Sequence, residues 1–227
     1  MKKYAAMLMM VLMLSLASIA GAAIGTIHDL NSQMDGEFTQ AGNWAYGWSS
    51  NLDDFGLLDY YIEGRAAPEL VRLWAHSTEA GPHLWYVVAG GNFFGSNAGE
   101  HGFCPPNGTT SAQYTTFRWT APAGVASAVD ITGLARPATD VQVKEIFVAK
   151  NGTPLFQMVT WGTQVDFTGM SNISIAAGDW IDFAIHRYDD SSGNDWCGLQ
   201  ATITEVPEPM TIGLLTLGGL ALLRRRR

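Results

Sequence analysis

The chain has 227 residues, with 13 Lys and Arg against 21 Asp and Glu. Six of the basic residues lie at the two ends, so the chain between Lys3 and Arg224 holds seven basic and 21 acidic residues, a net charge of −14. This excess of negative charge excludes nucleic-acid binding by counterion release, and anionic lipid headgroups repel it. Without the two terminal segments about 180 residues remain, which suits one domain or a domain with an appended subdomain.

The N-terminus has the three parts of a secretory signal peptide. Two lysines precede an apolar run from Tyr4 to Ala23, and that run ends in small residues. Signal peptidase requires small side chains just before its cut, so we expect residues 1–23 to be removed on export. The alternative is an uncleaved N-terminal membrane helix.

The C-terminus combines a short apolar stretch with a basic end. The charge-free stretch Met210–Leu223 is followed by Arg224, Arg225, Arg226 and Arg227. As a helix, fourteen residues span about 21 Å, less than the roughly 30 Å of the hydrocarbon core. Snorkelling arginines and local thinning make up such a difference. Arginines stay on the cytoplasmic side, so the sequence predicts a short anchor that leaves the body outside.

The same tail carries a family resemblance. Pro207, Glu208 and Pro209, followed by the apolar stretch and the arginines, resemble the PEP-CTERM sorting signal across residues 206–227. The resemblance implies that exosortase, a membrane-embedded transpeptidase-like enzyme, processes the chain after signal peptidase. Each proline fixes φ and lacks an N–H, which keeps the motif extended and suits a processing site. An ordinary linker before an ordinary anchor is the alternative.

The chain has two cysteines, Cys104 and Cys197. An even count in an exported chain predicts a disulfide between them. A closed loop of about 93 residues would stabilise the fold by roughly 4–5 kcal/mol in the chain-entropy model. Two thiols or an intermolecular bridge are the alternatives.

Residues 24–205 are predicted to form an all-β domain, an antiparallel β-sandwich. Short apolar runs alternate with clusters of Gly, Ser, Thr, Asn and Asp, and no helix of convincing length appears. Asn151-Gly152 predicts a two-residue type I′ hairpin, and Pro154 places that hairpin at a sheet edge. The Cys-Pro-Pro-Asn-Gly stretch at 104–108 is the best internal break, either between two sheets or between two domains.

Alternation of apolar and polar residues predicts the inward side chains of two strands. We expect Thr115, Phe117 and Trp119 on one face of 114–120. In the strand 180–186 we expect Ile181, Phe183 and Ile185 inward. Further strands are expected at 25–30, 44–50, 55–62, 70–76, 83–89 and 196–204.

A second resemblance covers roughly residues 114–205. The segments 117–122, 150–153, 177–183 and 198–203 resemble the recurring body of PEP-CTERM proteins. That body is similar to the jelly-roll sandwiches of carbohydrate-binding modules, which implies a jelly-roll-like fold. No ligand-binding residue comes with the resemblance.

Sugar binding needs an exposed flat aromatic ring with polar neighbours, because the ring stacks on the apolar face of a pyranose. Trp161, next to the predicted edge hairpin, is one candidate. Trp180, which shares a strand face with Asp182 and His186, is the other. The aromatic residues at i, i+2 and i+4 are assigned to the core: Trp44, Tyr46 and Trp48.

The loop 189–195 is the best metal candidate. Calcium prefers carboxylate, amide and carbonyl oxygens, and a glycine-containing loop can wrap one ion. The predicted ligands of this structural calcium are Asp189, Asp190, Asn194 and Asp195. A flexible acidic loop without metal is the alternative, and no other cofactor is indicated.

Known catalytic motifs are absent from the sequence: it has no G-x-S-x-G elbow, no H-E-x-x-H, no phosphate loop and no C-x-x-C. We therefore expect a non-enzymatic protein of the cell envelope or extracellular matrix, which binds polysaccharide or serves a structural role. Its expected partners are signal peptidase, exosortase, the membrane and polysaccharide. The rival is a secreted carbohydrate-active hydrolase or lyase, and a third reading is a tail-anchored structural protein without a ligand.

Overall fold

The computed structural model describes residues 25–34, 43–49, 52–58, 60–65, 70–75, 83–89, 96–104, 114–138, 144–187 and 196–206. The predicted signal peptide, the sorting signal with Pro207–Pro209 and Arg224–Arg227, and the predicted calcium loop lie outside the described residues. Within the described ranges, no helix combines the length and the apolar composition needed to cross a membrane.

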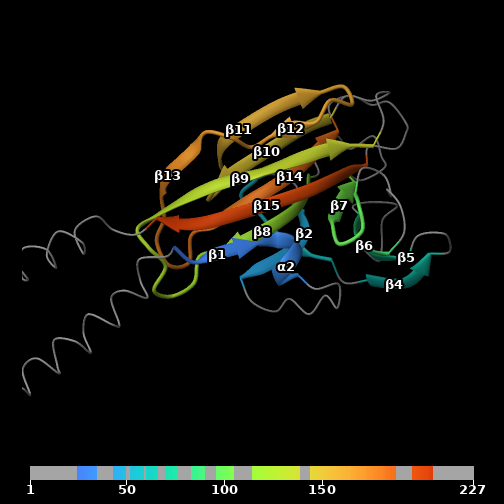
Figure 1. Ribbon diagram of the computed structural model, residues 1–227, viewed down its shortest axis with the longest axis horizontal. Helices are drawn as coiled ribbons and strands as arrows, with labels where there is room; N and C mark the ends of the chain where they lie inside the picture. The colour runs from blue at the N-terminus through green and yellow to red at the C-terminus, as the bar shows by residue number, and fades with distance from the viewer. Residues whose placement is uncertain are drawn as a thin grey trace, which may run out of the picture.

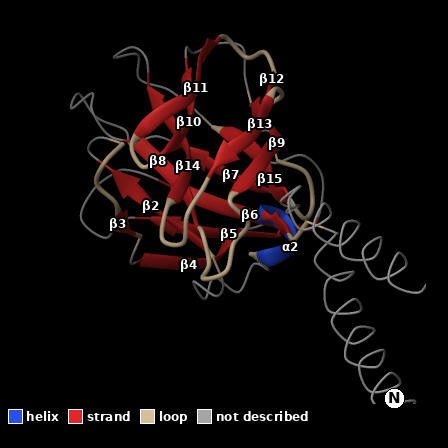
Figure 2. Ribbon diagram, turned by 90° about the vertical axis from the view of Figure 1, so that its left-hand side faces the viewer, coloured by secondary structure: helices blue, strands red, loops and turns tan. Residues whose placement is uncertain are grey.

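The described residues form two antiparallel sheets, as the sequence predicts (Figure 1, Figure 2). Sheet A contains β1 (Ile27–Asp29), β4 (Tyr60–Arg65), β5 (Leu70–Ala75), β6 (His83–Ala89), β7 (His101–Cys104), β9 (Ala128–Pro137), β12 (Val165–Asp166), β13 (Met170–Ser174) and β15 (Cys197–Val206). Sheet B contains β2 (Trp44–Ser49), β3 (Gly56–Leu57), β8 (Tyr114–Thr120), β10 (Lys144–Lys150), β11 (Thr153–Thr160) and β14 (Trp180–Arg187).

The strand order shows which strands lie at the edges. Sheet A runs β12-β9-β15-β7-β6-β5-β4, with β1 beside β15 and β13 beside β9. Sheet B runs β11-β10-β14-β8-β2-β3. One helical turn, α2 (Leu30–Gln33), follows β1, and Asp29 caps it by accepting a 2.8 Å hydrogen bond from the Ser32 backbone N–H. Asp side chains are favoured at this position because they satisfy an orphan backbone donor.

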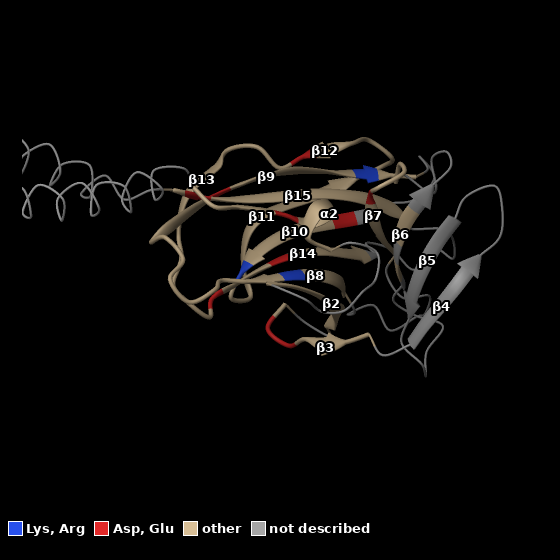
Figure 3. Cartoon of the chain, turned by 60° about the horizontal axis from the view of Figure 1, so that its bottom comes forward, with Lys and Arg blue, Asp and Glu red and all other residues tan. Residues whose placement is uncertain are grey.

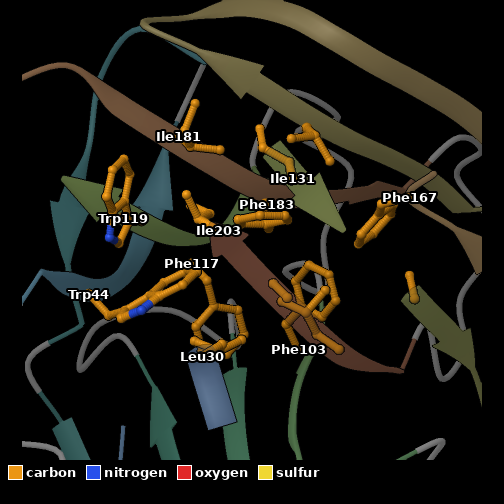
Figure 4. Packing of buried hydrophobic residues seen from close by; sticks show 14 of the residues in the cluster. Leu30, Trp44, Phe103, Phe117, Trp119, Ile131, Phe167, Ile181, Phe183 and Ile203 are labelled. Carbon is orange, nitrogen blue, oxygen red and sulfur yellow. The ribbon is translucent and has the colours of Figure 1, made fainter. Parts of the chain in front are cut away.

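The core lies between the two sheets (Figure 4). Phe117 of β8 meets Phe103 of β7 across the interface, with ring centroids 5.7 Å apart. The predicted inward faces of two strands are confirmed: Phe117, Trp119, Ile181, Phe183 and Ile185 are all fully buried. The assignment of Trp44 and Tyr46 to the core is also confirmed, because they are 1% and 3% exposed.

The predicted edge hairpin is present. Asn151 and Gly152 both have positive φ, 47° and 77°, as a type I′ turn requires. Strand β11 is the outermost strand of sheet B. Pro154 lies where the register shifts between Val148 and Ala149, so its missing N–H coincides with an irregularity in the ladder.

Several strand predictions need correction. The single strand expected at 55–62 is instead β3 in sheet B and β4 in sheet A, and the buried Leu58 lies between them. Strands β7, β9, β12 and β13 were not predicted. The stretch 104–108 does not separate the two sheets, because each sheet takes strands from both sides of it.

The predicted disulfide is wrong: Cys104 and Cys197 are not joined. Strand β7 pairs with β15 so that Phe103, rather than Cys104, lies opposite Cys197. Successive side chains of a strand point to opposite faces, so the two thiols lie on different faces of sheet A. Cysteines whose Cβ vectors diverge cannot be bridged without moving the backbone. Both side chains are buried.

Candidate functional site

The face of sheet B that points away from the core holds most of the polar candidates. We call it the outer face, and strand register divides it into three cross-strand rows, which bring side chains of neighbouring strands together. The first row contains Tyr114, His186, Glu145 and Val159; the second Thr116, Ala184, Phe147 and Gln157; the third Arg118, Asp182 and Ala149.

An ion pair dominates the third row. Arg118 Nε and Nη2 donate to the two carboxylate oxygens of Asp182, each at 2.7 Å. The Asp182 residue is 1% exposed. Burial raises the pKa of the Asp182 carboxyl, and the hydrogen bonds and charge of Arg118 oppose that shift. A bidentate guanidinium is the partner best suited to such a buried carboxylate.

Two aromatic rings enclose the same guanidinium. The Cζ atom of Arg118 lies 4.3 Å from the ring centroid of Phe55 and 4.8 Å from that of Trp180. Both distances are within the range of cation–π attraction. One face of the Trp180 ring is therefore occupied by Arg118, and both Asp182 oxygens accept bonds from it. Trp180 and Asp182, which were predicted to bind a ligand, therefore both contact Arg118 within the protein.

Residues 52–55, which precede the edge strand β3, lie at this end of the outer face, where Phe55 contacts Arg118. A Cβ on Gly47 would approach the Phe55 ring to 2.8 Å, closer than real Cβ contacts allow, and a Cβ on Gly152 would collide with Asp53. Glycine at these two positions lets the segment lie close to β2 and to the hairpin turn. Arg118 and Phe55 thus fasten the segment to the sheet.

The first row forms a second, more open group at the other end of the face. The rings of Tyr114 and His186 lie 4.8 Å apart, and His186 Nδ1 is 3.7 Å from a carboxylate oxygen of Glu145. Gln157 Nε2 donates to the other oxygen of Glu145 at 2.5 Å. Burial and then the Glu145 charge raise the pKa of Tyr114. This group offers a ring edge, hydroxyl, imidazole, amide and carboxylate within one area.

Thr116 lies between the two groups, and sequence reasoning missed it. The residue is 1% exposed, and among the atoms of the described residues its Oγ1 has no hydrogen-bond partner. Its cross-strand neighbours Gly47 and Ala184 are small. A buried hydroxyl without a partner costs about 1–3 kcal/mol, so it indicates either an internal water or a bound group. Its place on the polar side of an alternating strand was the only signal in the sequence.

Among the side chains that the structure describes, Trp161 is the most exposed of the large apolar ones, at 67%. It directly follows β11, whose last residue, Thr160, is registered with Lys144 and through it with Arg187. Trp161 therefore lies at the same end of sheet B as His186, two strands away from it. Three further exposed apolar side chains belong to β11 itself: Leu155, Met158 and Val159.

The described residues contain no group of three or more His, Cys, Asp or Glu side chains placed to hold a metal ion. The predicted calcium ligands Asp189, Asp190, Asn194 and Asp195 lie outside those residues. The carboxylates that are described on the outer face have protein partners instead: Arg118 for Asp182 and Gln157 for Glu145.

Comparison with known proteins gives no match: no family model fits the chain, and neither the curated proteins nor the solved structures contain a similar one.

Proposed function

We propose that the chain is an exported protein of the cell envelope or extracellular matrix whose jelly-roll-like body binds polysaccharide and catalyses no reaction. The observation that carries this proposal is Trp161, a large aromatic side chain left 67% exposed beside a polar row. Burying such a ring is favourable, so leaving it in water is characteristic of a binding surface. Tyr114, His186, Glu145 and Gln157 supply hydrogen-bonding groups at the same end of the sheet for sugar hydroxyls.

The proposal includes the route by which the chain reaches its place. Signal peptidase removes residues 1–23, and exosortase acts on the segment 206–227, whose Pro-Glu-Pro motif and arginines resemble a PEP-CTERM signal. Both terminal segments form apolar helices in the bilayer before processing. The apolar run of 14 residues is short for a permanent span, which suits a transient anchor.

The spacing of carboxylates favours binding over hydrolysis. Glycosidases use two carboxyls about 5–9.5 Å apart across a cleft. On the outer face, Asp182 is registered with Ala149 and His186 with Glu145. The two carboxyl-bearing positions are thus four residues apart along the strands, about 13 Å. Moreover, Asp182 is held by Arg118 and is not positioned to exchange a proton with a substrate.

The test is a polysaccharide-binding measurement on the full chain purified in detergent, by glycan array followed by affinity electrophoresis, with and without calcium. We expect Trp161→Ala to weaken binding about ten-fold, the loss that one stacked ring accounts for. The matched control is Leu57→Ala, which removes another exposed apolar side chain, 48% exposed, from the opposite edge of sheet B. Equal binding by the wild type and Trp161→Ala would remove the basis of the proposal.

The sorting step has its own test. A reporter inserted after Val206, ahead of the tail, should be active only outside the cytoplasm, because the N-terminal signal exports the chain up to the terminal arginines, which resist translocation. Deleting Arg224–Arg227 should release the chain from the membrane fraction. Unchanged membrane association would mean that the basic end plays no part in retention.

A further inference from the structure

The first and last described strands lie side by side. Strands β1 and β15 are antiparallel, with Ile27 opposite Thr204. The Glu205 N–H donates to the Thr26 carbonyl at 2.9 Å, beyond the end of the β1 ladder. The start of β1 and the end of β15 therefore lie at the same end of the body (Figure 1). We call this the proximal end of the body.

Two loops complete the proximal end. The loop between β8 and β9 is held to the turn before β14, because the Gly178 N–H donates to the Ala121 carbonyl at 3.0 Å. The Ile175 N–H likewise donates to the Ser127 carbonyl at 2.9 Å. Neither residues 121–129 nor residues 167–178 include a charged side chain. Nearby Ile27 is 57% exposed.

The acidic residues that border these loops are engaged by protein partners. Glu205 is bound to His28 Nε2 at 3.0 Å and accepts from the Ala126 N–H at 2.9 Å. Asp179 is 3.1 Å from Lys150 Nζ. Asp130 accepts from the Asn172 N–H at 2.7 Å. In Figure 3, acidic and basic positions are red and blue, and stretches of uncharged loop between them are tan. The loops themselves therefore carry no charge that anionic headgroups would repel.

We propose that the proximal end of the body, comprising Ile27 and the loops 121–129 and 174–178, rests against the lipid bilayer surface. The inference rests on the proposed membrane anchoring: the C-terminal apolar segment is joined to the body here, and a short tail cannot hold any other part of the body against the bilayer. Small and apolar side chains without charge tolerate the headgroup region. The occupant of this surface is the lipid surface itself.

This orientation sets the position of the candidate sugar-binding group. Strand β11 starts at the hairpin turn near the proximal end and runs for eight residues to Thr160. Eight residues of strand extend about 26 Å. Trp161, His186 and Tyr114 are therefore carried about that distance from the bilayer, where extracellular polysaccharide has access to them.

The test measures the depth of single fluorescent labels on the full chain, with its tail, in vesicles of phosphatidylethanolamine and phosphatidylglycerol. One added cysteine at a time is labelled: Ala123→Cys, Ala177→Cys or, as the distal control, Thr163→Cys. All three positions are exposed, whereas Cys104 and Cys197 are buried, and the chain without an added cysteine measures any background labelling. We expect quenching by headgroup-region spin-labelled lipids to be about two-fold or more stronger at positions 123 and 177 than at 163.

Flotation of the same vesicles separates this inference from the anchoring on which it rests. If the chain floats with the vesicles and position 163 is quenched as strongly as 123 and 177, the orientation is overturned while the anchoring stands. If the chain does not float, the anchoring fails and this inference fails with it. Flotation together with selective quenching at 123 and 177 supports both.

Discussion

On its inner face, sheet B buries rings and branched aliphatic side chains; on its outer face, it buries an arginine–aspartate pair and a threonine. Phe117, Ile181 and Phe183 on the inner side are all 0% exposed. These side chains stabilise the fold because their apolar area is removed from water, and this stabilisation does not depend on any one partner residue. Asp182 on the outer side is almost as buried, but its burial is tolerable only while Arg118 satisfies both oxygens.

The comparison shows that equal burial does not mean equal tolerance to mutation. An apolar face loses stability in proportion to the volume removed and recovers in part by relaxing. A buried charge pair loses most when one member is removed, yet loses little when both are replaced together. The following predictions test this contrast.

The largest loss is expected from Phe183→Ala. Phe183 is fully buried, and its ring contacts those of Trp44 and Phe167 at centroid distances of 5.8 and 5.9 Å. Truncating a core phenylalanine costs about 3–5 kcal/mol through lost transfer energy and a cavity. Urea unfolding should show the loss. The control Leu57→Ala, at a position 48% exposed, should change the free energy of unfolding by less than about 0.5 kcal/mol.

A smaller loss is expected from Asp182→Ala, about 3 kcal/mol, because it leaves the Arg118 guanidinium without its carboxylate on the outer face. The double variant Arg118→Met/Asp182→Leu should return to within about 1 kcal/mol of the wild type, since neither charge then remains. Urea unfolding of both variants completes the comparison. If the double variant is as unstable as Asp182→Ala, the loss does not come from leaving one charge unpaired, and the prediction is wrong.

His101 of β7, in sheet A, is a polar residue buried against the core, and its burial makes the stability of the fold depend on pH. Its ring is fully buried against Tyr86 and Phe117, and burial lowers its pKa to about 3. An unfolded histidine has a pKa of about 6.5, so between these values the unfolded state binds the extra proton. Above pH 6.5 the neutral His101 therefore costs the folded state nothing through protonation. As the pH falls from 6.5 toward 3, the free energy of unfolding decreases by up to about 1.4 kcal/mol per pH unit.

Urea unfolding at several pH values checks this slope. His101→Phe is the matched control, because Asn31 Oδ1 still accepts from the backbone N–H of residue 101 at 3.0 Å and a ring still fills the site. The variant should lose most of the slope between pH 6.5 and 4. An unchanged slope would assign the acid sensitivity to other groups.

The smallest effect is expected from Thr116→Val. The exchange keeps the shape of the side chain and removes a buried hydroxyl that has no hydrogen-bond partner among the described residues. We expect a gain of up to about 1 kcal/mol in unfolding free energy. A loss of stability would mean that an internal water satisfies Oγ1. Weaker polysaccharide binding at unchanged stability would place the hydroxyl in the sugar-binding site.

Much of the inner face could be predicted from the sequence. Alternation in 114–120 and 180–186 identified the side chains that face the core, because one face of each strand packs on it. The Asn151-Gly152 turn was equally clear, since few dipeptides accept two positive φ angles. Both signals lie in a short stretch of sequence, so they can be interpreted without knowing the rest of the fold.

The missed strands had weaker local signals. Strand β9 alternates in burial, but Gly133 with φ 149° and Pro137 interrupt the pattern. Strand β7 is buried at all four of its residues, so it shows no alternation. The break at Leu58 could not be seen, because the chain changes sheets there without a proline or glycine at that position.

The candidate site was only half predictable. Alternation placed Trp180, Asp182 and His186 on one face, and the structure confirms that. That Arg118 would hold Asp182 depends on a pairing across 64 residues. For the same reason the register of β7 on β15, which separates Cys104 from Cys197, was invisible in the sequence. Register between distant strands is set by the whole sheet.

The pairing of β1 with β15 has a consequence for folding. His28 and Glu205, which bond across these strands, are 177 residues apart in sequence. Non-local pairings close late, because the entropy of the intervening loop is spent before the contact forms. Under the export proposed above, β1 would have to wait until nearly the whole body had been translocated. Completion of the sandwich would then be timed to the arrival of the tail, and folding would be coupled to the last stage of export.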